Sequence, residues 1–344
     1  MRPPAFWSGP PDSLPGRLLQ PLGSLAGAVT SRRAARPGFR AAVPVICCGN
    51  ATLGGAGKTV VALDIAQRLQ ACGRRVAVLL RGYGGAARGP RLVRPGDDSA
   101  LVGDEALLLA EVAPTWIGAD RAASARAAIA AGADVLVLDD GLQNPTLHKD
   151  LSLLVVDGGS GFGNGRLFPA GPLRETVAAA AARCGAAVLI GPDRAGVAVA
   201  LPNLMVLRAR LVPRPEIAAL VGRPVLAFAG IGRPEKFFAT LAGAGARLAG
   251  AVAFPDHHPY RTAEIQRLLH RAARLGAVPV TTAKDAVRIP ATLREEIDVV
   301  RVRLVWDDPA SLDELLATVI SRSSTRRGED RAGVDGASNG ERDR

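Results

Sequence analysis

One segment of the 344-residue chain restricts its possible folds more than any other, a glycine-rich loop between an apolar run and a helical run. Residues 43–48 are apolar and predict a buried strand, and residues 60–71 have the pattern of a helix. Residues 54–59, which lie between them, read Gly-Gly-Ala-Gly-Lys-Thr. This order of strand, glycine loop, Lys-Thr pair and helix is typical of a phosphate-binding loop, or P-loop.

The residue types of this loop suit the binding of a polyphosphate. Glycines let backbone N–H groups turn toward phosphate oxygens, and the helix that follows adds its partial positive charge. Lys58 is expected to reach the β- and γ-phosphates, and the Thr59 hydroxyl is expected to hold Mg²⁺. The first glycine of the usual pattern is Thr52 here. The residues expected to bind a magnesium-complexed nucleoside triphosphate are Thr52, Gly54, Gly55, Ala56, Gly57, Lys58 and Thr59.

A second apolar run ends in two acids. Residues 135–138 predict a buried strand, and Asp139 and Asp140 follow it directly. One carboxylate is expected to complete the magnesium shell with Thr59, and the other can orient a water ligand or the acceptor. Further polar clusters stand at strand ends or loops, where a parallel sheet can bring them together, although spacing alone also fits solvent-exposed loops. These clusters are Arg81–Gly85, Gly103–Glu105 and Asp256–His258.

Apolar runs rich in Val, Ile and Leu alternate with alanine-rich helical stretches along most of the chain, which is typical of parallel βα units. A second series of such units begins near residue 224, after a Pro-rich stretch. We therefore predict an α/β fold with a P-loop NTPase-type, mostly parallel sheet, helices on both faces, and a smaller α/β C-terminal lobe. A tail follows from residue 321, where almost nothing apolar remains and disorder is expected.

Basic residues are concentrated at the N-terminus of a chain whose formal net charge is +11. Residues 1–40 contain six arginines and one acid, together with an apolar run at residues 18–29 that is too short to span a bilayer. This pattern favours a helix that lies in the interface of an anionic membrane; a helix packed on the protein's own core is the alternative. Aromatic residues make up only 4% of the chain and no nucleic-acid-binding motif occurs, so no nucleic-acid partner is expected.

Taken together, these stretches resemble the tetraacyldisaccharide 4'-kinases, the lipid A kinases of Gram-negative envelope synthesis. The matching phrases run in family order over nearly all of residues 1–290 and include, besides the loops above, residues 163–165, 169–175, 227–238 and 282–285. The resemblance implies transfer of phosphate from Mg²⁺–ATP to the 4'-hydroxyl of a lipid A disaccharide precursor in the membrane. It also implies a peripheral protein at the cytoplasmic face of the inner membrane, and a monomer is expected.

The resemblance implies roles for individual residues. Asp104 looks like the base that takes the proton of the sugar hydroxyl, and His257 looks like its partner. The expected catalytic residues are Asp104, His257, Lys58, Asp139 and Asp140; the expected metal ligands are Thr59, Glu105 and Asp139; and the expected substrate contacts are Arg81, Asn164 and Arg174. The expected division of the chain is a membrane-associating segment at 1–40, a P-loop kinase domain at 41–210, a smaller lobe that completes the site at 211–320 and a tail at 321–344.

Two positions depart from the family pattern. Asn144 stands where the family usually has His, and Ala283 stands where it usually has Glu, so no catalytic role is assigned to position 144. The main alternative is a membrane-associated regulatory ATPase of the deviant P-loop class, but that class has Lys where this chain has Leu53. A regulatory GTPase is a further alternative, but residues 282–285 place the lysine of its base-reading motif one position late.

Overall fold

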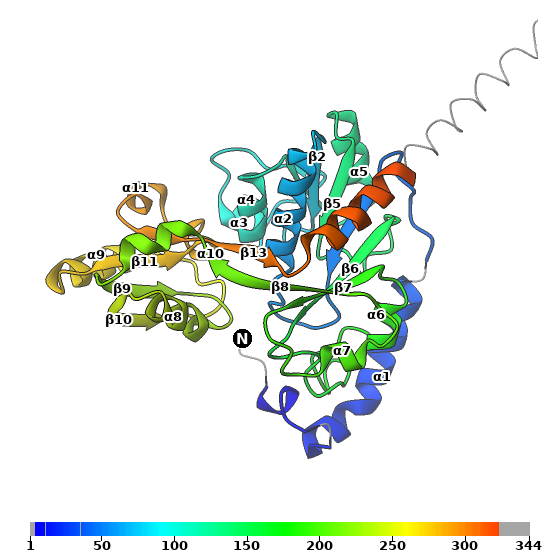
Figure 1. The fold of residues 1–344 in the computed structure, drawn as a ribbon, viewed down its shortest axis with the longest axis horizontal. Helices are drawn as coiled ribbons and strands as arrows, with labels where there is room; N and C mark the ends of the chain where they lie inside the picture. Colours follow the sequence, from blue (N-terminus) through cyan, green and yellow to red (C-terminus); the bar gives the residue numbers. More distant parts are fainter. Residues whose placement is uncertain (1–3, 11, 35, 323–344) are drawn as a thin grey trace, which may run out of the picture.

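The computed structural model describes residues 4–10, 12–34 and 36–322 and shows two α/β lobes side by side (Figure 1). The larger lobe is built on a sheet that has nine strands within these residues, in the order β13-β8-β7-β6-β1-β5-β2-β4-β3. Neighbouring strands are parallel except for the pairs β13–β8 and β3–β4. The strands are β1 (Val45–Gly49), β2 (Val76–Leu80), β3 (Arg91–Leu92), β4 (Thr115–Ile117), β5 (Val135–Asp139), β6 (Leu151–Asp157), β7 (Ala186–Ile190), β8 (Val206–Pro213) and β13 (Val302–Trp306). The predicted mostly parallel sheet is confirmed.

Helices cover both faces of this sheet. Successive side chains of a strand point to opposite faces, and Cys47 and Cys48 of β1 accordingly lie in two different hydrophobic clusters. The Cys48 cluster is covered by α2 (Lys58–Ala71), α3 (Ser99–Val102), α4 (Asp104–Ala110) and the helix at residues 309–322. The Cys47 cluster is covered by α5 (Arg121–Ala130), α6 (Val177–Ala181) and α7 (Val197–Ala200). The predicted helices on both faces are therefore confirmed.

The smaller lobe repeats the βα pattern on a parallel sheet with the strand order β10-β9-β11-β12. Its strands are β9 (Pro224–Ala229), β10 (Arg247–Ala253), β11 (Val278–Thr282) and β12 (Asp298–Val300). Its helices are η2 (Pro215–Leu220), α8 (Pro234–Gly243), α9 (Thr262–Arg274), α10 (Ala283–Ala286) and α11 (Ala291–Arg294). Hydrophobic clusters on the two faces of the sheet centre on Ala227 and on Phe228, which are neighbours in β9. The second lobe is therefore a folded α/β unit with its own core.

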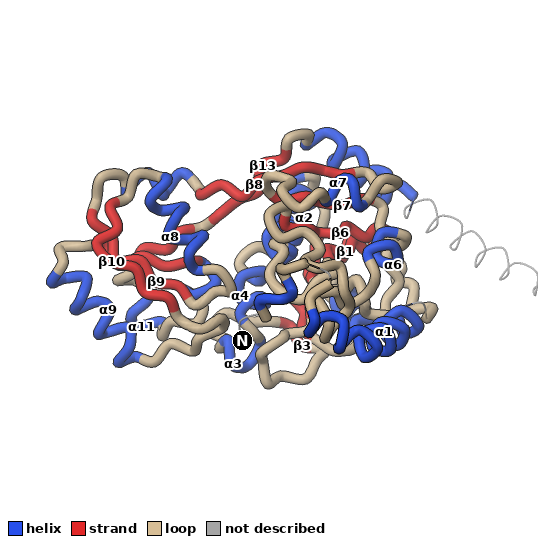
Figure 2. Tube along the Cα trace, turned by 90° about the horizontal axis from the view of Figure 1, so that it is seen from below, coloured by secondary structure: helices blue, strands red, loops and turns tan. Residues whose placement is uncertain are grey.

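Two antiparallel strands join the lobes. β8 runs from the larger sheet toward the smaller lobe, and β13 returns beside it, with Trp306 opposite Ala209 and Val302 opposite Pro213 (Figures 1 and 2). The chain then ends its described part on the larger lobe, where Leu312 and Leu316 pack in the same core as β1. The expected smaller lobe at 211–320 thus includes a strand and a helix that belong to the larger one. Their apolar pattern suits either lobe, so only the three-dimensional packing assigns them.

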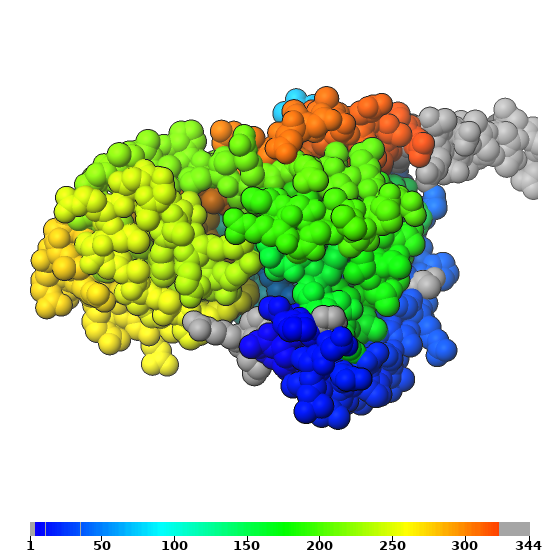
Figure 3. Space-filling model, turned by 60° about the horizontal axis from the view of Figure 1, so that its bottom comes forward, coloured from blue at the N-terminus to red at the C-terminus, as the bar shows by residue number. Residues whose placement is uncertain are grey.

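The N-terminal helix α1 (Leu14–Ala34) follows a short turn, η1 (Ala5–Trp7), and lies along the surface of the larger lobe (Figure 3). Its small residues face the protein, because a Cβ atom added to Gly23 would lie 2.7 Å from the carbonyl oxygen of Leu167. Apolar side chains recur on the opposite face at helical spacing, each between 59% and 71% exposed: Leu14, Leu18, Leu22, Leu25 and Val29. Among the helices of the described residues, none is both long and apolar enough to pass through a bilayer.

Candidate active site

The predicted P-loop lies at the carboxyl end of β1, with α2 beginning at Lys58. Gly57 directly precedes the helix with a φ of 91°, a conformation that glycine adopts without strain. Gly49, at the end of β1, has a different reason to be glycine, because a Cβ atom there would lie 2.5 Å from the Cβ of Leu142. The close approach of these two strand ends brings the loop after β5 next to the P-loop.

The substitution of threonine for the first P-loop glycine has a structural explanation. Among the described residues other than glycine, only Asp140 and His257 have φ in the left-handed region, so the backbone at Thr52 does not require glycine. The loop is instead held by the segment that follows Gly171: Leu53 N–H donates to Pro172 O over 2.7 Å, and Arg174 N–H donates to Ala51 O over 2.7 Å. Residues 169–175, which carry much of the family resemblance, thus support the P-loop.

Asp139 is a buried acid at the carboxyl end of β5, directly beside β1. It is 1% exposed, and neither of its carboxylate oxygens makes a hydrogen bond to any of the described residues. Burial, together with the charge of Glu105, raises the pKa of Asp139 to about 7; the charge of Lys58 and, to a smaller extent, the nearby Thr59 hydroxyl act in the opposite direction. A buried carboxylate with both oxygens unpaired fits a cation, which would supply the missing partner.

No three His, Cys, Asp or Glu side chains lie close enough within the described residues to form a metal site by themselves. Mg²⁺ does not need such a cluster, because proteins usually hold it with one or two carboxylates while substrate phosphates and water complete its shell. Asp139, Glu105 and the Thr59 hydroxyl fit this requirement. The residues present are therefore compatible with Mg²⁺ bound together with a nucleotide.

We expect magnesium–nucleotide binding to release protons in a pH-dependent way. A carboxyl whose pKa is about 7 is largely protonated at pH 6, and its proton must leave when a cation takes its place. The apparent affinity should therefore fall by up to about tenfold for each pH unit below 7. Calorimetry in buffers of different ionisation enthalpy measures the proton release. Asp139→Asn should abolish it, and a wild-type affinity that is constant between pH 6 and 8 would contradict the expectation.

Asp140, the residue after Asp139, has its backbone in the left-handed conformation, with a φ of 53°. Arg174 donates two hydrogen bonds to the Asp140 carboxylate, of 2.8 Å to Oδ1 and 3.1 Å to Oδ2. The Lys58 ammonium lies 3.7 Å from the same Oδ1. Asp140 thus links the P-loop lysine to the segment that supports the loop.

The smaller lobe brings a histidine to the larger one. Nδ1 of His257, in the loop after β10, lies 2.8 Å from Oδ2 of Asp104, the first residue of α4, although the two are 153 residues apart. The hydrogen bond to Asp104 raises the pKa of His257. Burial raises the pKa of Asp104, but the hydrogen bond from His257 and the charge of Arg288 outweigh it, so the pKa is lowered. The carboxylate therefore stays ionised near neutral pH.

Glu105, the next residue of α4, also meets the smaller lobe. Its Oε1 lies 3.0 Å from the Lys284 ammonium. Asp285 is fully buried and accepts hydrogen bonds of 2.8 Å from the Gly230 N–H and from the Tyr260 hydroxyl. A GTPase would need the carboxylate of this loop to face the guanine base. The burial of Asp285 therefore argues against that alternative.

The remaining predicted residues lie in different surroundings. Arg81 is exposed at the carboxyl end of β2. Asn164 is 5% exposed, and its amide donates to Phe6 O over 3.2 Å and to Ala170 O over 3.0 Å. Asn164 thus ties the loop at residues 163–170 to the N-terminal turn. Asn144 caps a turn by accepting the Thr146 N–H over 3.0 Å, which is a structural role.

The structure also places charged residues that the sequence did not single out. Arg121 begins α5, is 2% exposed and donates to the Gly118 carbonyl; burial lowers its pKa to about 10, although the charge of Asp140 opposes this. Asp157, at the end of β6, accepts hydrogen bonds from two residues of the smaller lobe, Arg233 over 2.8 Å and Lys236 over 3.1 Å. The partners of Asp157 come from the other lobe, so they depend on how the two lobes meet and no local sequence pattern indicates them.

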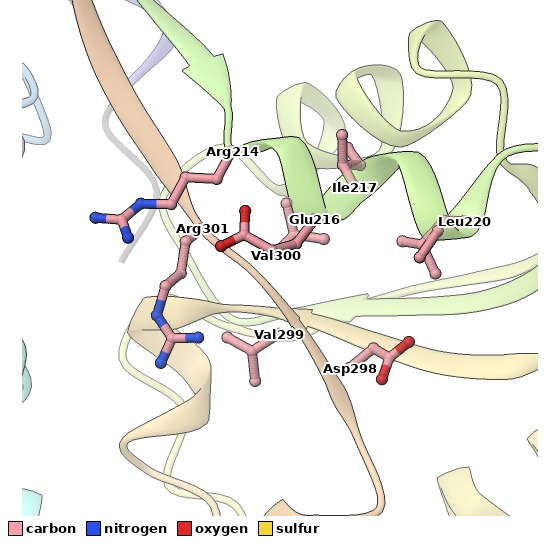
Figure 4. A pocket seen from close by; sticks show the side chains of 9 residues that line it. Arg214, Glu216, Ile217, Leu220, Asp298, Val299, Val300 and Arg301 are labelled. Carbon is pink, nitrogen blue, oxygen red and sulfur yellow. The ribbon is translucent and has the colours of Figure 1, made fainter.

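A cavity of about 240 Å³ lies in the smaller lobe, apart from these residues. It is formed between η2 and β12, and Arg214, Glu216, Asp298 and Arg301 contribute its charged side chains (Figure 4). None of the predicted site residues lines it. The two acids and two arginines balance in charge, so this cavity has no preference for a polyphosphate.

The fold and the site together define a P-loop nucleotide-binding protein of the α/β class, in which a second lobe supplies a histidine to the acids beside the P-loop. The chain matches the family model for tetraacyldisaccharide-1-P 4'-kinase over residues 16–321. It belongs to this family.

Close relatives support this membership. The chain is 56% identical to the tetraacyldisaccharide 4'-kinase of Gluconacetobacter diazotrophicus over 327 residues, which cover 94% of this chain and 100% of the relative. It is 53% identical to the enzyme of Gluconobacter oxydans over 324 residues, which cover 94% and 99%. The crystal structure of LpxK from Aquifex aeolicus in complex with ATP has the same fold, with a TM-score of 0.73 at 23% identity over 89% of this chain and 99% of that one.

Proposed function

We propose that this protein transfers the γ-phosphoryl group of ATP to the 4'-hydroxyl of a tetraacyldisaccharide 1-phosphate in lipid A biosynthesis, which gives lipid IVA. The observation that carries the proposal is the contact of 2.8 Å between His257 and Asp104 at the edge of the sheet that holds the P-loop. The relatives that cover almost the whole chain are named as tetraacyldisaccharide 4'-kinases, which supports the choice of acceptor.

The residues of the chain divide the work of this reaction. Lys58 and the backbone N–H groups of the P-loop bind the β- and γ-phosphates. Mg²⁺, held by Thr59, Asp139 and Glu105, would neutralise charge on the phosphate oxygens. Asp104 takes the proton of the sugar hydroxyl, and its Oδ2 contacts both His257 and Arg288. His257 fixes the orientation of the carboxylate, and Arg81 and Arg174 contribute contacts to phosphate or substrate.

The two-lobe arrangement suits a transfer that must exclude water. Glu105 and Asp104 belong to the larger lobe, and each is paired with a residue of the smaller lobe. The full set of catalytic groups is therefore complete only when the lobes meet. In such a site most of the rate enhancement comes from positioning and from stabilised charge.

Transfer to the sugar is tested with labelled ATP and the disaccharide lipid, followed by location of the new phosphate. We expect label at the 4' position and slow ATP hydrolysis without acceptor. Rapid hydrolysis without any lipid acceptor, with no labelled lipid, would favour the regulatory ATPase instead. Label at another hydroxyl would contradict the proposed acceptor position.

The acceptor's acyl chains stay in a bilayer, and α1 offers a surface that suits this location. Its exposed leucines form one apolar face, and Arg32 and Arg33 lie in its last turn. In our proposal the helix lies in the interface at the cytoplasmic face of the inner membrane, with the leucines among acyl chains and the arginines at anionic headgroups. The protein is then peripheral, and it reaches its substrate without leaving the membrane surface.

Charge placed on the apolar face of α1 should release the protein from membranes. We expect Leu22→Glu combined with Leu25→Glu to weaken binding to vesicles that contain anionic phospholipid by roughly tenfold or more for each leucine, because each loses its burial among acyl chains. Vesicle flotation measures the bound fraction. Ser24→Glu is the matched control, since Ser24 is exposed on the same helix beside the apolar face. Equal loss per added charge in the control would mean that net charge alone governs binding.

A further inference from the structure

Arg288 is a buried cation of the smaller lobe that lies next to the Asp104–His257 pair. It follows α10, and its side chain is only 4% exposed. Its Nε atom lies 3.3 Å from Oδ2 of Asp104, the same oxygen that lies 2.8 Å from Nδ1 of His257. One carboxylate oxygen of the larger lobe therefore meets a guanidinium and an imidazole, both from the smaller lobe.

Each nitrogen of the Arg288 guanidinium has a partner within the smaller lobe. Nε donates to Lys284 O over 3.1 Å, and Nη1 donates to His258 O over 3.1 Å. Nη2 donates to Gly230 O over 3.0 Å and to Asp285 Oδ1 over 2.9 Å. The carbonyls of Gly230 and His258 belong to the loops that follow β9 and β10, and the Lys284 carbonyl belongs to α10, four residues before Arg288. A planar guanidinium with donors in fixed directions can join these two loops to α10 in this way, whereas a lysine ammonium is a single point charge.

The backbone of His257 is held from both sides by these contacts. Its N–H donates over 3.0 Å to Gly230 O, which also accepts from Arg288, and the carbonyl of the next residue, His258, accepts Nη1 of Arg288. His257 itself has a φ of 57°, in the left-handed region that a histidine rarely adopts. Such a conformation persists when the surrounding structure determines it fully. The hydrogen bonds of the Arg288 guanidinium help to hold His257 in this conformation.

Asp285 anchors Arg288 in turn. It is fully buried, and its Oδ1 accepts the Gly230 N–H and the Tyr260 hydroxyl, each over 2.8 Å, besides Arg288. A buried ion pair carries a large desolvation cost and adds little net stability, so its presence is better explained by a need for fixed geometry. The one group that Arg288 reaches outside its own lobe, among the described residues, is Asp104.

We propose that Arg288 is the positioning residue of the Asp104–His257 pair: its planar guanidinium fixes the backbone of residues 257–258 so that the imidazole meets Oδ2 of Asp104. The proposal extends the proposed function, because it assigns to Arg288 the assembly of the base that acts in phosphoryl transfer. Arg288 itself takes no part in proton or phosphoryl transfer.

The pKa of His257 distinguishes two possible effects of Arg288, the positioning of the Asp104–His257 pair and the electrostatic effect of its charge. Asp104, Asp256 and Arg288 are the charged groups that act on its imidazole; Asp104 also feels Lys284, and Glu105 is its neighbour in α4. The hydrogen bond to Asp104 raises the pKa of His257, whereas the charge of Arg288 lowers it. If the pair separates, the pKa of His257 should fall toward the ordinary value of about 6.5. If charge is lost and the pair stays intact, the pKa should rise.

Arg288→Lys is the first test, because it keeps the charge and removes the fork. We expect kcat to fall about 10²-fold, as small misplacements of a catalytic group do, with little change in the KM for ATP. The titration of His257 by NMR should shift toward lower pH. The chain has four histidines, so His257→Gln suffices to assign the signal. An Arg288→Lys protein with wild-type kcat and an unchanged His257 titration would overturn the proposal.

Two further variants serve as a control and as an alternative test. Arg294→Lys is the matched control: Arg294 lies in α11 of the same lobe, donates one hydrogen bond of 2.9 Å to Ile289 O, and should leave both readouts unchanged. If the first variant does not fold, Asp285→Asn combined with Arg288→Gln replaces the buried ion pair with neutral groups. A fall in the pKa of His257 in that double variant supports the proposal, and a rise or no change contradicts it. If the wild-type protein phosphorylates no lipid, the proposed function fails, but the titration still decides the role of Arg288.

Discussion

Asp104→Asn is expected to lower kcat roughly 10²–10⁴-fold, the usual cost of losing a general base. The amide has the shape of the carboxylate and can still accept a hydrogen bond from His257, but it cannot take a proton from the sugar hydroxyl. The KM for ATP should change little, because the P-loop lies on a separate element. Steady-state kinetics with the disaccharide lipid and ATP measure both constants. His257→Ala should act in the same direction, since it removes the partner that orients the carboxylate.

Asp256→Asn is the matched control for this experiment. Asp256 is adjacent to His257, with Oδ1 4.0 Å from Nε2, but its side chain is 44% exposed. An exposed ion pair at this distance contributes little, so kcat should stay within about twofold of the wild-type value. If Asp104→Asn raised only KM and left kcat unchanged, the carboxylate would bind substrate rather than accept its proton.

Lys58→Ala is expected to lower kcat by roughly 10²–10³-fold or more, since it removes a preorganised positive charge from the phosphates in the transition state. The Lys58 side chain is 11% exposed and lies at the start of α2, where the helix dipole also favours phosphate. The fold should survive, because Asp140 keeps its two hydrogen bonds from Arg174. Kinetics and the melting temperature are measured together.

A folded Lys58→Ala protein with near-normal turnover would rule out the P-loop assignment. Loss of both activity and folding would be uninformative about phosphate binding, and Lys58→Met then provides the test, since it keeps most of the apolar stem and removes only the charge. Near-normal turnover of the Lys58→Met protein would also rule out the P-loop assignment.

The sequence predicted those features that depend on short stretches of chain. The P-loop is one strand, one loop and one helix, so its pattern survives even with Thr52 in place of glycine. Asp139 and Asp140 follow a buried strand, and the strand neighbours that the fold requires place them beside that loop. The resemblance to a known family added the association of Asp104 with His257, which no local pattern reveals.

Features that depend on how the two lobes meet were beyond the sequence. Lys284 pairs with Glu105, and Arg233 and Lys236 pair with Asp157, because the smaller lobe packs against the larger one. In its own segment of the sequence, each of these residues looks like an ordinary charged surface residue. The return of the chain to the larger sheet at β13 is a similar case, since an apolar strand pattern does not specify its neighbour. The sequence does not reveal that the Asn164 amide donates to Phe6 O and Ala170 O, and its contact with substrate stays a prediction.

A crystal structure with Mg²⁺ and a non-hydrolysable ATP analogue tests the central claim most directly. We expect the triphosphate to lie along residues 54–59, the ion to contact Asp139 and the Thr59 hydroxyl, and the γ-phosphate to face the Asp104–His257 pair. A nucleotide bound elsewhere, or a P-loop that stays empty at saturating nucleotide, would contradict the assignment of this edge of the sheet as the site of phosphoryl transfer.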